Sequence, residues 1–276
     1  KHVVCTANGT SAIQIALKIL GVKEIYTSPF SFAATVAAPK WLGIKVKFVD
    51  FDEAFPEDKP VIATHVYGIP NITTLGKPII YDASHAFTTK IDGKSILNYG
   101  DVSCISFSAV KIFQTGEGGA LVTNNDYIAK QARQMRNYGL KDRYAIGGIG
   151  LNAKMSEIHA AMGLTVLPYV NKIRKQLDSI VQRYNEALNQ DLPSGCLLYY
   201  PVVLPSAKKL SRALRDFEDN NIFPRRYFYP PLNKAYGGKS CPVAEDYINR
   251  VLALPLHYYL KKHTFDEAYI HYSAGG

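Results

Sequence analysis

Short apolar runs alternate with amphipathic segments as far as residue 137, and this alternation constrains the fold more than any other feature. The strands that we expect cover residues 3–6, 24–27, 45–49, 61–65, 77–81, 102–107 and 120–123. The helices that we expect cover residues 11–20, 33–42 and 127–137. Such alternation is typical of a mostly parallel central sheet with helices on both faces. The sequence therefore predicts an α/β fold.

The pattern changes after the glycine-rich loop 138–151. A long helical stretch follows from residue 154 to about residue 189, with an expected break near Pro168. Beyond it we expect strands at 196–204 and 223–229, and helices at 207–220, at 243–251 and near residue 264. This change predicts a large domain, 1–165, and a smaller C-terminal α+β domain, 166–276.

Composition excludes several classes of protein. The 276 residues are 47% hydrophobic, enough to bury a large core. No apolar stretch reaches the roughly 20 residues of a membrane span, and no signal peptide opens the sequence, so we expect no membrane partner and a cytoplasmic location. The sequence begins inside a predicted strand, so we also expect a segment before it. The four cysteines lie far apart without a C-x-x-C spacing, which predicts neither a metal site nor a disulfide framework.

The chain is basic, with a formal net charge of +9. Its basic residues are scattered and lack the charged stripe of a nucleic-acid surface, so no nucleic-acid partner is expected. An anionic small substrate such as a nucleotide diphosphate fits the charge at least as well.

The segment SFSAVKIFQTGEGG, from Ser106 to Gly119, holds one lysine, Lys111, between an apolar run and a glycine-rich turn. Upstream, the segment YDASHAF carries Asp82 at the end of another apolar run. A pyridoxal phosphate (PLP) enzyme needs this pair, because a lysine amine forms a Schiff base with the cofactor aldehyde and a carboxylate keeps the pyridine nitrogen protonated. Taken singly, each residue is more often a solvated lysine or a turn-forming aspartate. Both residues follow predicted parallel strands, and ligands bind at the carboxyl ends of such strands, which favours the functional interpretation.

The segment Asn8-Gly9-Thr10-Ser11 opens a predicted helix and is the second chemical feature. Free backbone N–H groups and the positive end of the helix dipole suit a single phosphate. The plainer interpretation is an ordinary helix cap by Asn8 or Thr10, which the sequence alone favours.

Several motifs in order resemble the DegT/DnrJ/EryC1/StrS family of PLP-dependent nucleotide-sugar aminotransferases. They are ANGTSA, TSPFSFAAT, ATHVYG, YDASHAF, SFSAVK…TGEGG, GLNAKMSEIHAAMG and RRYFYPPLN, and they extend from residue 1 to about residue 260. The resemblance implies PLP fold type I, the aspartate aminotransferase-like fold. Three of the motifs are most similar to the branch that includes dTDP-4-amino-4,6-dideoxyglucose (viosamine) synthases.

The resemblance assigns a role to each matching residue. It implies that Lys111 carries the cofactor, that Asp82 is the pyridine-nitrogen partner, and that both are catalytic. It implies that the cofactor phosphate is bound by Gly9, Thr10, Ser11 and Ser106. It also implies that Phe32 stacks on the cofactor ring and that His85 lies near the phenolic oxygen. A buried core phenylalanine and a satisfied structural histidine remain the alternatives for the last two.

Asn152 matches an asparagine that reaches the cofactor phosphate of a neighbouring subunit, so the resemblance implies a homodimer with shared active sites. Without the resemblance, Asn152 is read as a helix N-cap. Ala153 and Lys154 stand where many members have Tyr-Arg, and Ser108 stands where many have His. These differences bear on the substrate contacts.

The activity that the resemblance implies is transfer of an amino group from L-glutamate to a keto-deoxy-sugar nucleotide. The leading acceptor is dTDP-4-keto-6-deoxyglucose, which gives dTDP-4-amino-4,6-dideoxyglucose. A 3-keto sugar nucleotide is the near alternative, and Lys154, His257 and Arg225 or Arg226 bear on the choice if they line the sugar site. A non-catalytic PLP-binding regulatory protein is the alternative from another class, and the intact set of Lys111, Asp82 and Ser106 disfavours it.

Overall fold

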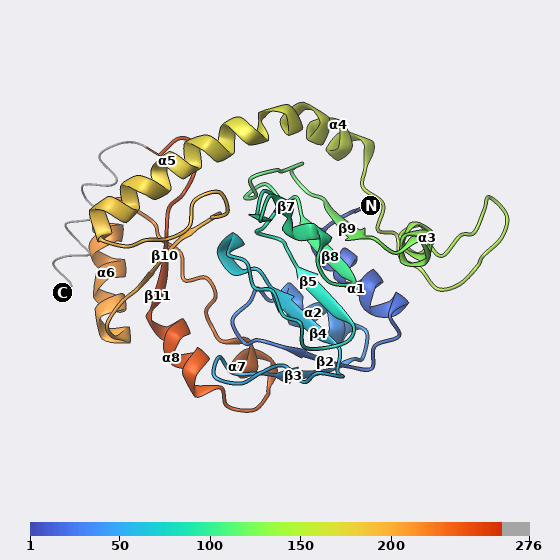
Figure 1. Cartoon of the computed structure of the whole chain (residues 1–276), viewed down its shortest axis with the longest axis horizontal. Coiled ribbons are helices and arrows are strands. Elements are labelled where there is room, and N and C mark those ends of the chain that lie inside the picture. Colours follow the sequence, from blue (N-terminus) through green and yellow to red (C-terminus); the bar gives the residue numbers. More distant parts are fainter. Residues whose placement is uncertain (261–276) are drawn as a thin grey trace.

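The computed structural model of the chain describes residues 1–260, and a seven-stranded sheet forms its centre (Figure 1). The strand order is β1-β9-β8-β5-β4-β2-β3. The strands are β1 (His2–Thr6), β2 (Glu24–Thr27), β3 (Lys45–Phe48), β4 (Val61–Thr64), β5 (Ile79–Asp82), β8 (Val102–Ser106) and β9 (Gly119–Thr123). Five neighbouring strands run parallel: β3, β2, β4, β5 and β8. Strand β9 is antiparallel to both of its neighbours, β8 and β1. The mostly parallel sheet predicted from the sequence is confirmed.

Three helices cover one face of this sheet. They are α1 (Gly9–Ile19), α2 (Ala34–Trp41) and α3 (Asp126–Met135), and α1 packs against the other two. The inward side chains of α1, such as Ile13 and Leu17, are buried against strand residues such as Ile80 and Leu121. Alternate strand residues point to the other face, where Ile105 and Val122 pack with Val170 at the start of a long helix. Burial on both faces explains why the strands read as continuous apolar runs.

The helical stretch after the first sheet has the break expected at Pro168. Helix α4 (Glu157–Val166) and helix α5 (Val170–Leu188) are joined by a 3-10 turn, η3 (Leu167–Tyr169). Figure 1 shows α4 and α5 extending across the top of the molecule, from the large sheet to the C-terminal part. The C-terminal part thus shares a helix with the large sheet.

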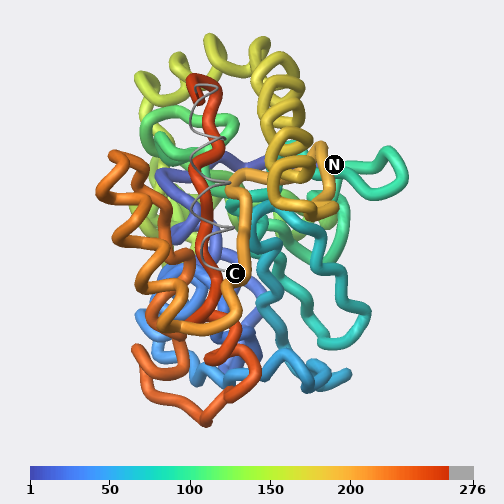
Figure 2. Tube along the Cα trace, turned by 90° about the vertical axis from the view of Figure 1, so that its left-hand side faces the viewer, coloured from blue at the N-terminus to red at the C-terminus, as the bar shows by residue number. Residues whose placement is uncertain are grey.

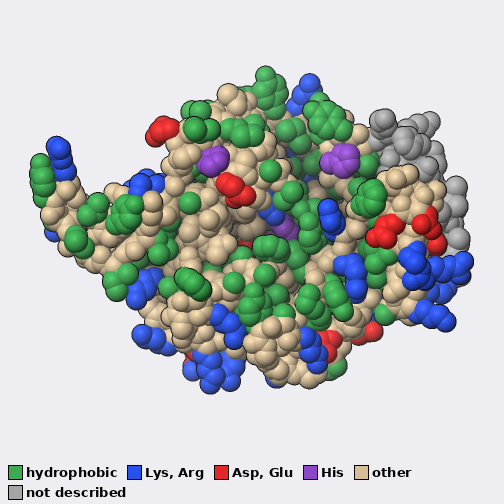
Figure 3. All heavy atoms as spheres, turned by 180° about the vertical axis from the view of Figure 1, so that it is seen from behind, with side chains coloured by type: hydrophobic (Ala, Val, Ile, Leu, Met, Phe, Trp, Pro, Cys, Tyr) green, Lys and Arg blue, Asp and Glu red, His purple; other side chains and the backbone are tan. Residues whose placement is uncertain are grey.

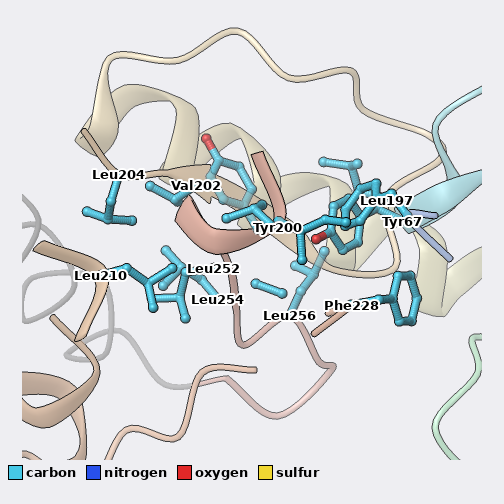
Figure 4. Close-up of a cluster of buried hydrophobic side chains, with 14 of the residues drawn as sticks. Tyr67, Leu197, Tyr200, Val202, Leu204, Leu210, Phe228, Leu252, Leu254 and Leu256 are labelled. Carbon is cyan, nitrogen blue, oxygen red and sulfur yellow. The ribbon is translucent and has the colours of Figure 1, made fainter. Parts of the chain in front are cut away.

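A two-stranded antiparallel sheet lies at the far end of α5. It consists of β10 (Tyr200–Val203) and β11 (Val251–Leu254), which Figure 2 shows side by side. Around it are α6 (Ala207–Asp219), α7 (Leu232–Tyr236) and α8 (Pro242–Arg250). Its core includes Tyr200, Leu252 and Leu254, and Figure 4 shows that Tyr67 and Phe228 continue this cluster toward the large sheet.

A polar contact also joins the two parts. The carboxylate of Asp50, just after β3, accepts hydrogen bonds from the backbone N–H groups of Val243 (3.0 Å) and Ala244 (2.7 Å) in the first turn of α8. Because these N–H groups have no acceptor within their own helix, Asp50 is the N-terminal cap of α8 although it lies far away in the sequence. The large sheet and α8 are therefore held together.

Residues 138–151 form an arm that extends away from the body of the molecule (Figure 1). Figure 3 shows hydrophobic and basic side chains together at its end. Tyr144 is 87% exposed and Ile146 is 79% exposed. The arm therefore presents apolar surface that no other described residue covers.

The remaining short elements are the 3-10 turns η1 (Val66–Gly68) and η2 (Ile96–Asn98) and a small hairpin of β6 (Lys90–Ile91) and β7 (Lys94–Ser95). None of the helices among residues 1–260 combines the length and apolar character that a membrane crossing requires.

Three expectations in the second half differ from the structure. Residues 223–229 are irregular apart from one bridge between Arg225 and Ala253. Pro224 has no N–H to donate to a ladder, and the N–H of Tyr229 bonds back to the carbonyl of Arg226 (2.8 Å) in a turn. The strand beside β10 is β11, where a helix was expected to end at residue 251 and no strand was expected. The strand expected over residues 196–204 begins only at Tyr200, because the backbone N–H of Leu198 bonds instead to the carbonyl of Tyr67. The helix expected near residue 264 lies outside the described residues.

Candidate active site

Strands β5 and β8 bring Asp82 and the Lys111 loop together. Asp82 is the last residue of β5 and lies in register with Cys104 on the parallel strand β8. The chain leaves β8 at Ser106 and turns back through Lys111, whose backbone N–H donates to the carbonyl of Ser108 (2.9 Å). Phe113 anchors this turn by packing against Phe107, with ring centroids 4.9 Å apart. Both candidate catalytic residues therefore lie at the carboxyl edge of the sheet, as predicted.

Their side chains line one cavity of about 330 Å³. It is lined by Asn8, Gly9, Thr10, Ile13, Phe32, Ala34, Asp82, Ser84, His85, Ser106, Ser108, Val110, Lys111, Glu117, Tyr199, Tyr227 and Phe228. Seven of the nine residues predicted for the site line this cavity. Ser11 follows Thr10 in the first turn of α1 but is not part of the lining. Asn152 is also absent from the lining.

Asp82 lies almost fully buried, at 3% exposure, and is held from two sides. Its Oδ1 accepts hydrogen bonds from the hydroxyl (2.6 Å) and the backbone N–H (3.2 Å) of Ser84. Its Oδ2 accepts one from the hydroxyl of Thr35 (2.7 Å). An ionised carboxylate has about four acceptor positions, so these three donors, which come from the described residues, leave one on Oδ2. The carboxylate is thus rigid and has room for one more N–H donor.

Lys111 is half-buried, and its environment changes its protonation. Burial lowers the pKa of its amine to about 8, although the nearby negative charge of Asp82 acts in the opposite direction. A lysine with a lowered pKa is unprotonated more often near neutral pH, which makes it a better nucleophile. The geometry therefore supplies an activated amine opposite a fixed carboxylate.

His85 contacts the same cavity from the side. Its Nδ1 accepts a hydrogen bond from the backbone N–H of Tyr67 (3.1 Å), and its ring stacks on Phe228 with centroids 5.6 Å apart. Burial and the positive charge of Lys111 lower the pKa of His85 well below its usual value, so the ring is neutral. Because Nδ1 is the acceptor, the proton is on Nε2, which can donate to a ligand.

The amino terminus of α1 forms one end of the cavity. The N–H groups of Gly9 and Thr10 occupy the first helical positions and have no acceptor within the helix. Close approach requires glycine at two places: a Cβ on Gly9 would lie 3.1 Å from the Cβ of Ser106, and one on Gly119 would lie 2.4 Å from the backbone carbon of Asn8. The TGEGG turn therefore lets β9 lie directly against this helix end.

Ser11 differs from the other predicted phosphate donors. Its backbone N–H donates to Oδ1 of Asn8 (2.8 Å), and its hydroxyl donates to the carbonyl of Asn8 (2.9 Å). Asn8 is thus the helix cap, as the plainer sequence interpretation expected. Both donors of Ser11 are engaged in that cap, and Ser11 does not line the cavity.

Phe32 and Asn152 are both exposed. Phe32 lines the cavity while 57% exposed, and its ring lies 6.1 Å from that of Phe228. Asn152 lies at the base of the arm, where its Oδ1 accepts a hydrogen bond from the amine of Lys154 (2.6 Å). The structure does not bring Asn152 to the cavity of its own chain.

A larger cavity of about 800 Å³ adjoins the first. Lys111, Tyr199 and Tyr227 line both, so the lysine lies at their boundary. Arg225 and His257 line the larger cavity, and Lys172 joins them, which makes it basic. Arg226 instead lines a third cavity and lies over the ring of Tyr229, 3.7 Å from its centroid.

The residues that surround Asp82 were not predicted from the sequence. Ser84 follows it by two positions, whereas Thr35 comes from α2 and is fully buried. The signal available was the spacing of Ser31 and Thr35 in SPFSFAAT, two hydroxyls one helical turn apart in an apolar segment. Tyr227 and Phe228 were missed as cavity residues because a strand was predicted there.

The cavity suits pyridoxal phosphate. The spare acceptor position on Asp82 matches a protonated ring nitrogen, the amine of Lys111 matches the aldehyde, and the free N–H groups of α1 match a phosphate. The three groups belong to one cavity that has room for a small planar molecule.

Comparison with known proteins gives a consistent result. The family model of the DegT/DnrJ/EryC1/StrS aminotransferase family matches residues 1–269. The dTDP-4-amino-4,6-dideoxy-D-glucose transaminase of Shigella dysenteriae is 36% identical over 290 residues, which cover 91% of this chain and 79% of the relative. The GDP-perosamine synthase of Vibrio cholerae is 29% identical, covering 92% of this chain and 81% of that protein.

Solved structures share the fold. A family aminotransferase from Brucella abortus has a TM-score of 0.88 and 26% identity, covering 99% of this chain and 86% of that one. DesI, solved in the presence of its TDP-sugar product, has a TM-score of 0.86 and 26% identity, covering 98% and 79%. The predicted α/β aminotransferase fold is confirmed.

Proposed function

Because this chain belongs to the DegT/DnrJ/EryC1/StrS aminotransferase family of PLP-dependent nucleotide-sugar aminotransferases, we propose that it aminates a 4-keto-6-deoxy sugar nucleotide with L-glutamate as donor. The observation that carries the proposal is the single cavity that joins Lys111, Asp82 and the amino terminus of α1. The expected acceptor is dTDP-4-keto-6-deoxyglucose, and the expected product is dTDP-4-amino-4,6-dideoxyglucose.

Bound pyridoxal phosphate supplies an aldehyde that combines with amines and a ring that accepts the electron pair released when a C–H bond beside the amine breaks. In our proposal Lys111 holds the cofactor between turnovers. With the donor bound in place of the lysine, the free amine of Lys111 would take the proton from the donor's α-carbon and would return it to the carbon that the cofactor contributes beside the nitrogen. The lowered pKa of Lys111 supports this role, because a base acts best with a pKa near the working pH.

The other cavity residues bind and orient. Asp82 would accept the N–H of the ring and keep its positive charge in place, and His85 would donate from Nε2 to the phenolic oxygen. Gly9 and Thr10, together with the hydroxyl of Ser106, hold the phosphate at the helix end. Phe32 covers one face of the ring.

Two observations support the choice of acceptor. The larger cavity beside Lys111 carries Lys172, Arg225 and His257, a basic lining that suits a diphosphate. The relative from Shigella dysenteriae, named for a 4-amino product, is more similar to this chain than the 3-aminotransferase of Acidithiobacillus ferrooxidans, at 36% against 27% identity. Amination at C3 is therefore the second candidate.

We also propose that the active form is a homodimer in which the arm reaches the partner subunit. Asn152 does not line the cavity of its own chain, and the arm carries exposed apolar side chains such as Tyr144 and Ile146. A second copy would cover this surface, as large exposed patches on soluble proteins mark interaction sites. In this arrangement Asn152 binds the cofactor phosphate in the partner's cavity.

The purified protein tests the function directly. Its visible absorbance is recorded with pyridoxal phosphate, before and after L-glutamate. Glutamate should convert the yellow lysine-bound cofactor into its amine form, and dTDP-4-keto-6-deoxyglucose should restore the yellow form with release of a 4-amino sugar detected by mass spectrometry. Restoration by 3-keto but not 4-keto acceptors would establish the second candidate, and absence of any yellow form would contradict the assignment of Lys111.

A further inference from the structure

A row of hydroxyl groups, two of them fully buried, ends at the carboxylate of Asp82. The hydroxyl of Thr35 donates to Oδ2 of Asp82 (2.7 Å), the oxygens of Thr35 and Ser31 lie 2.7 Å apart, and those of Ser31 and Thr64 lie 2.9 Å apart. Ser31 and Thr35 are fully buried, and Asp82 is nearly so. The three hydroxyls come from the end of β4, the loop before α2 and the first turn of α2.

The direction of every hydrogen bond in this row is determined by Asp82. An ionised carboxylate only accepts, so the proton of Thr35 points to Asp82. The oxygen of Thr35 must then accept the proton of Ser31, and the oxygen of Ser31 must accept the proton of Thr64. All three O–H dipoles therefore point the same way, and aligned hydrogen bonds of this kind polarise and strengthen one another.

We propose that Thr35, Ser31 and Thr64 are positioning residues that stabilise the negative charge of Asp82 and aim its Oδ2 at the ring nitrogen of the cofactor. The inference rests on the proposed role of Asp82. Thr35 fills one acceptor position of Oδ2 and leaves the other open, while Ser84 holds Oδ1. The carboxylate is thus presented to the cofactor in one orientation.

A neighbouring threonine shows that burial alone does not require such a row. Thr27, at the end of β2, is 1% exposed, and its hydroxyl donates to the backbone carbonyl of Ile62 (2.9 Å). That contact satisfies a buried hydroxyl locally and ends there. Ser31 and Thr35 instead form two hydrogen bonds in series that end at a charged carboxylate.

The main experiment measures the affinity of the cofactor-free protein for pyridoxal phosphate and for its 1-deaza analogue, in which CH replaces the ring nitrogen. Thr35→Val should weaken binding of pyridoxal phosphate about tenfold, a loss of about 1.4 kcal/mol, because valine keeps the shape and removes the hydroxyl. It should change binding of the analogue less than about twofold, because the analogue has no N–H to meet Asp82. Thr27→Val is the matched control and should change neither affinity.

The position along the row gives a second readout. Ser31→Ala should weaken pyridoxal phosphate binding less than Thr35→Val does, and Thr64→Val should weaken it least, since polarisation decreases with each bond. Thr35→Ser restores a hydroxyl and should return the affinity to near the wild-type value. In stopped-flow experiments with L-glutamate, the maximal rate of the first half-reaction should fall in the same order, with little change in the glutamate concentration that gives half-maximal rate.

Two outcomes overturn the inference and a third separates it from the proposed function. If Thr35→Val weakens binding of both cofactors equally, or weakens neither more than Thr27→Val does, the row only supports the fold. If Asp82→Ala itself leaves the affinity and the half-reaction unchanged, the proposed role of Asp82 fails, and the inference fails with it. A strong effect of Asp82→Ala with none from Thr35→Val contradicts the inference alone.

Discussion

The amine of Lys111 and the carboxylate of Asp82 influence one another across the cavity. Burial disfavours the charged amine, and the carboxylate favours it, so the pKa of about 8 is the balance of two opposed effects. The reactivity of the Lys111 amine in the cofactor-free protein therefore depends in part on the charge of Asp82.

This dependence gives a prediction with a definite sign. In the cofactor-free protein the reaction of Lys111 with an amine-specific reagent should rise with pH, with a midpoint near 8. At pH 7 about one-tenth of the amine is already unprotonated, far more than for a solvated lysine. Because Asp82 raises the pKa of Lys111, Asp82→Asn should move the midpoint to lower pH. Labelling followed by peptide mass spectrometry measures it, with Lys111→Ala as the blank; a midpoint near 10 would contradict the expected burial.

Removing the amine should abolish the reaction. Lys111→Ala should prevent covalent trapping of pyridoxal phosphate by borohydride and should lower turnover by at least about 10³, within the range of general acid–base contributions. Lys130→Ala, which removes an exposed lysine of α3, is the control and should retain both. Intact-mass measurement after reduction and a coupled glutamate assay give the two readouts, and trapping at wild-type yield in Lys111→Ala would assign the linkage to another residue.

Strand β9 packs against the amino terminus of α1, where the phosphate of the cofactor is proposed to bind. Gly119 is buried against the backbone of Asn8 and Gly9, so β9 holds the first turn of α1 against Ser106. The free N–H groups of this turn are therefore fixed in place before a phosphate arrives.

Gly119→Ala should disturb both the fold and the phosphate site. The added Cβ would lie 2.4 Å from the carbon of Asn8 and 2.6 Å from the nitrogen of Gly9, and backbone atoms must shift to make room. We expect a loss of about 1–3 kcal/mol in unfolding free energy and weaker binding of pyridoxal phosphate. Gly148→Ala adds a methyl group where no atom lies within 4 Å and serves as control. Urea denaturation and cofactor titration measure the effects; an unchanged Gly119→Ala protein would show that this contact is not tight.

Prediction from sequence succeeded for elements whose apolar pattern and boundaries are local. The strand over Glu24–Thr27 and the break at Pro168 follow from residues within the segment itself. The pairing of β10 with β11 could not be predicted, because Val251–Leu254 reads equally well as a helix end until its partner across the chain is known. Lys111 and Asp82 could be predicted because each lies in a local motif. Thr35 and Phe228 could not, because they reach the site only through tertiary packing.

The cap of α8 by Asp50 is a polar link between the C-terminal part and the large sheet. Asp50→Ala should lower the unfolding free energy by about 1–2 kcal/mol, the usual contribution of a helix cap. The exposed Asp52, two residues on, provides the control Asp52→Ala, which should have little effect. Thermal or urea unfolding of the two variants measures the difference, and equal stability would mean that water replaces the carboxylate without loss.

Assembly is tested by mixing two inactive variants. In the proposed dimer, chains with Lys111→Ala and chains with Asn152→Ala form hybrids in which one of the two cavities has both native residues. Random mixing makes about half of the dimers hybrids, so activity should return to about a quarter of the wild-type value. Refolding the two chains together and separately provides the measurement, and no recovery in the mixture would indicate that each cavity uses its own Asn152.

The contact between Asp50 and α8 also has a consequence for substrate selectivity. With the C-terminal part fastened to the large sheet, and with Tyr67 and Phe228 in their common core, the larger cavity has its form before any sugar enters. We expect such a cavity to select its substrate mainly by the shape of its lining. Directed evolution toward a new sugar should therefore accumulate substitutions on the cavity lining, leaving the connections between the two parts unchanged.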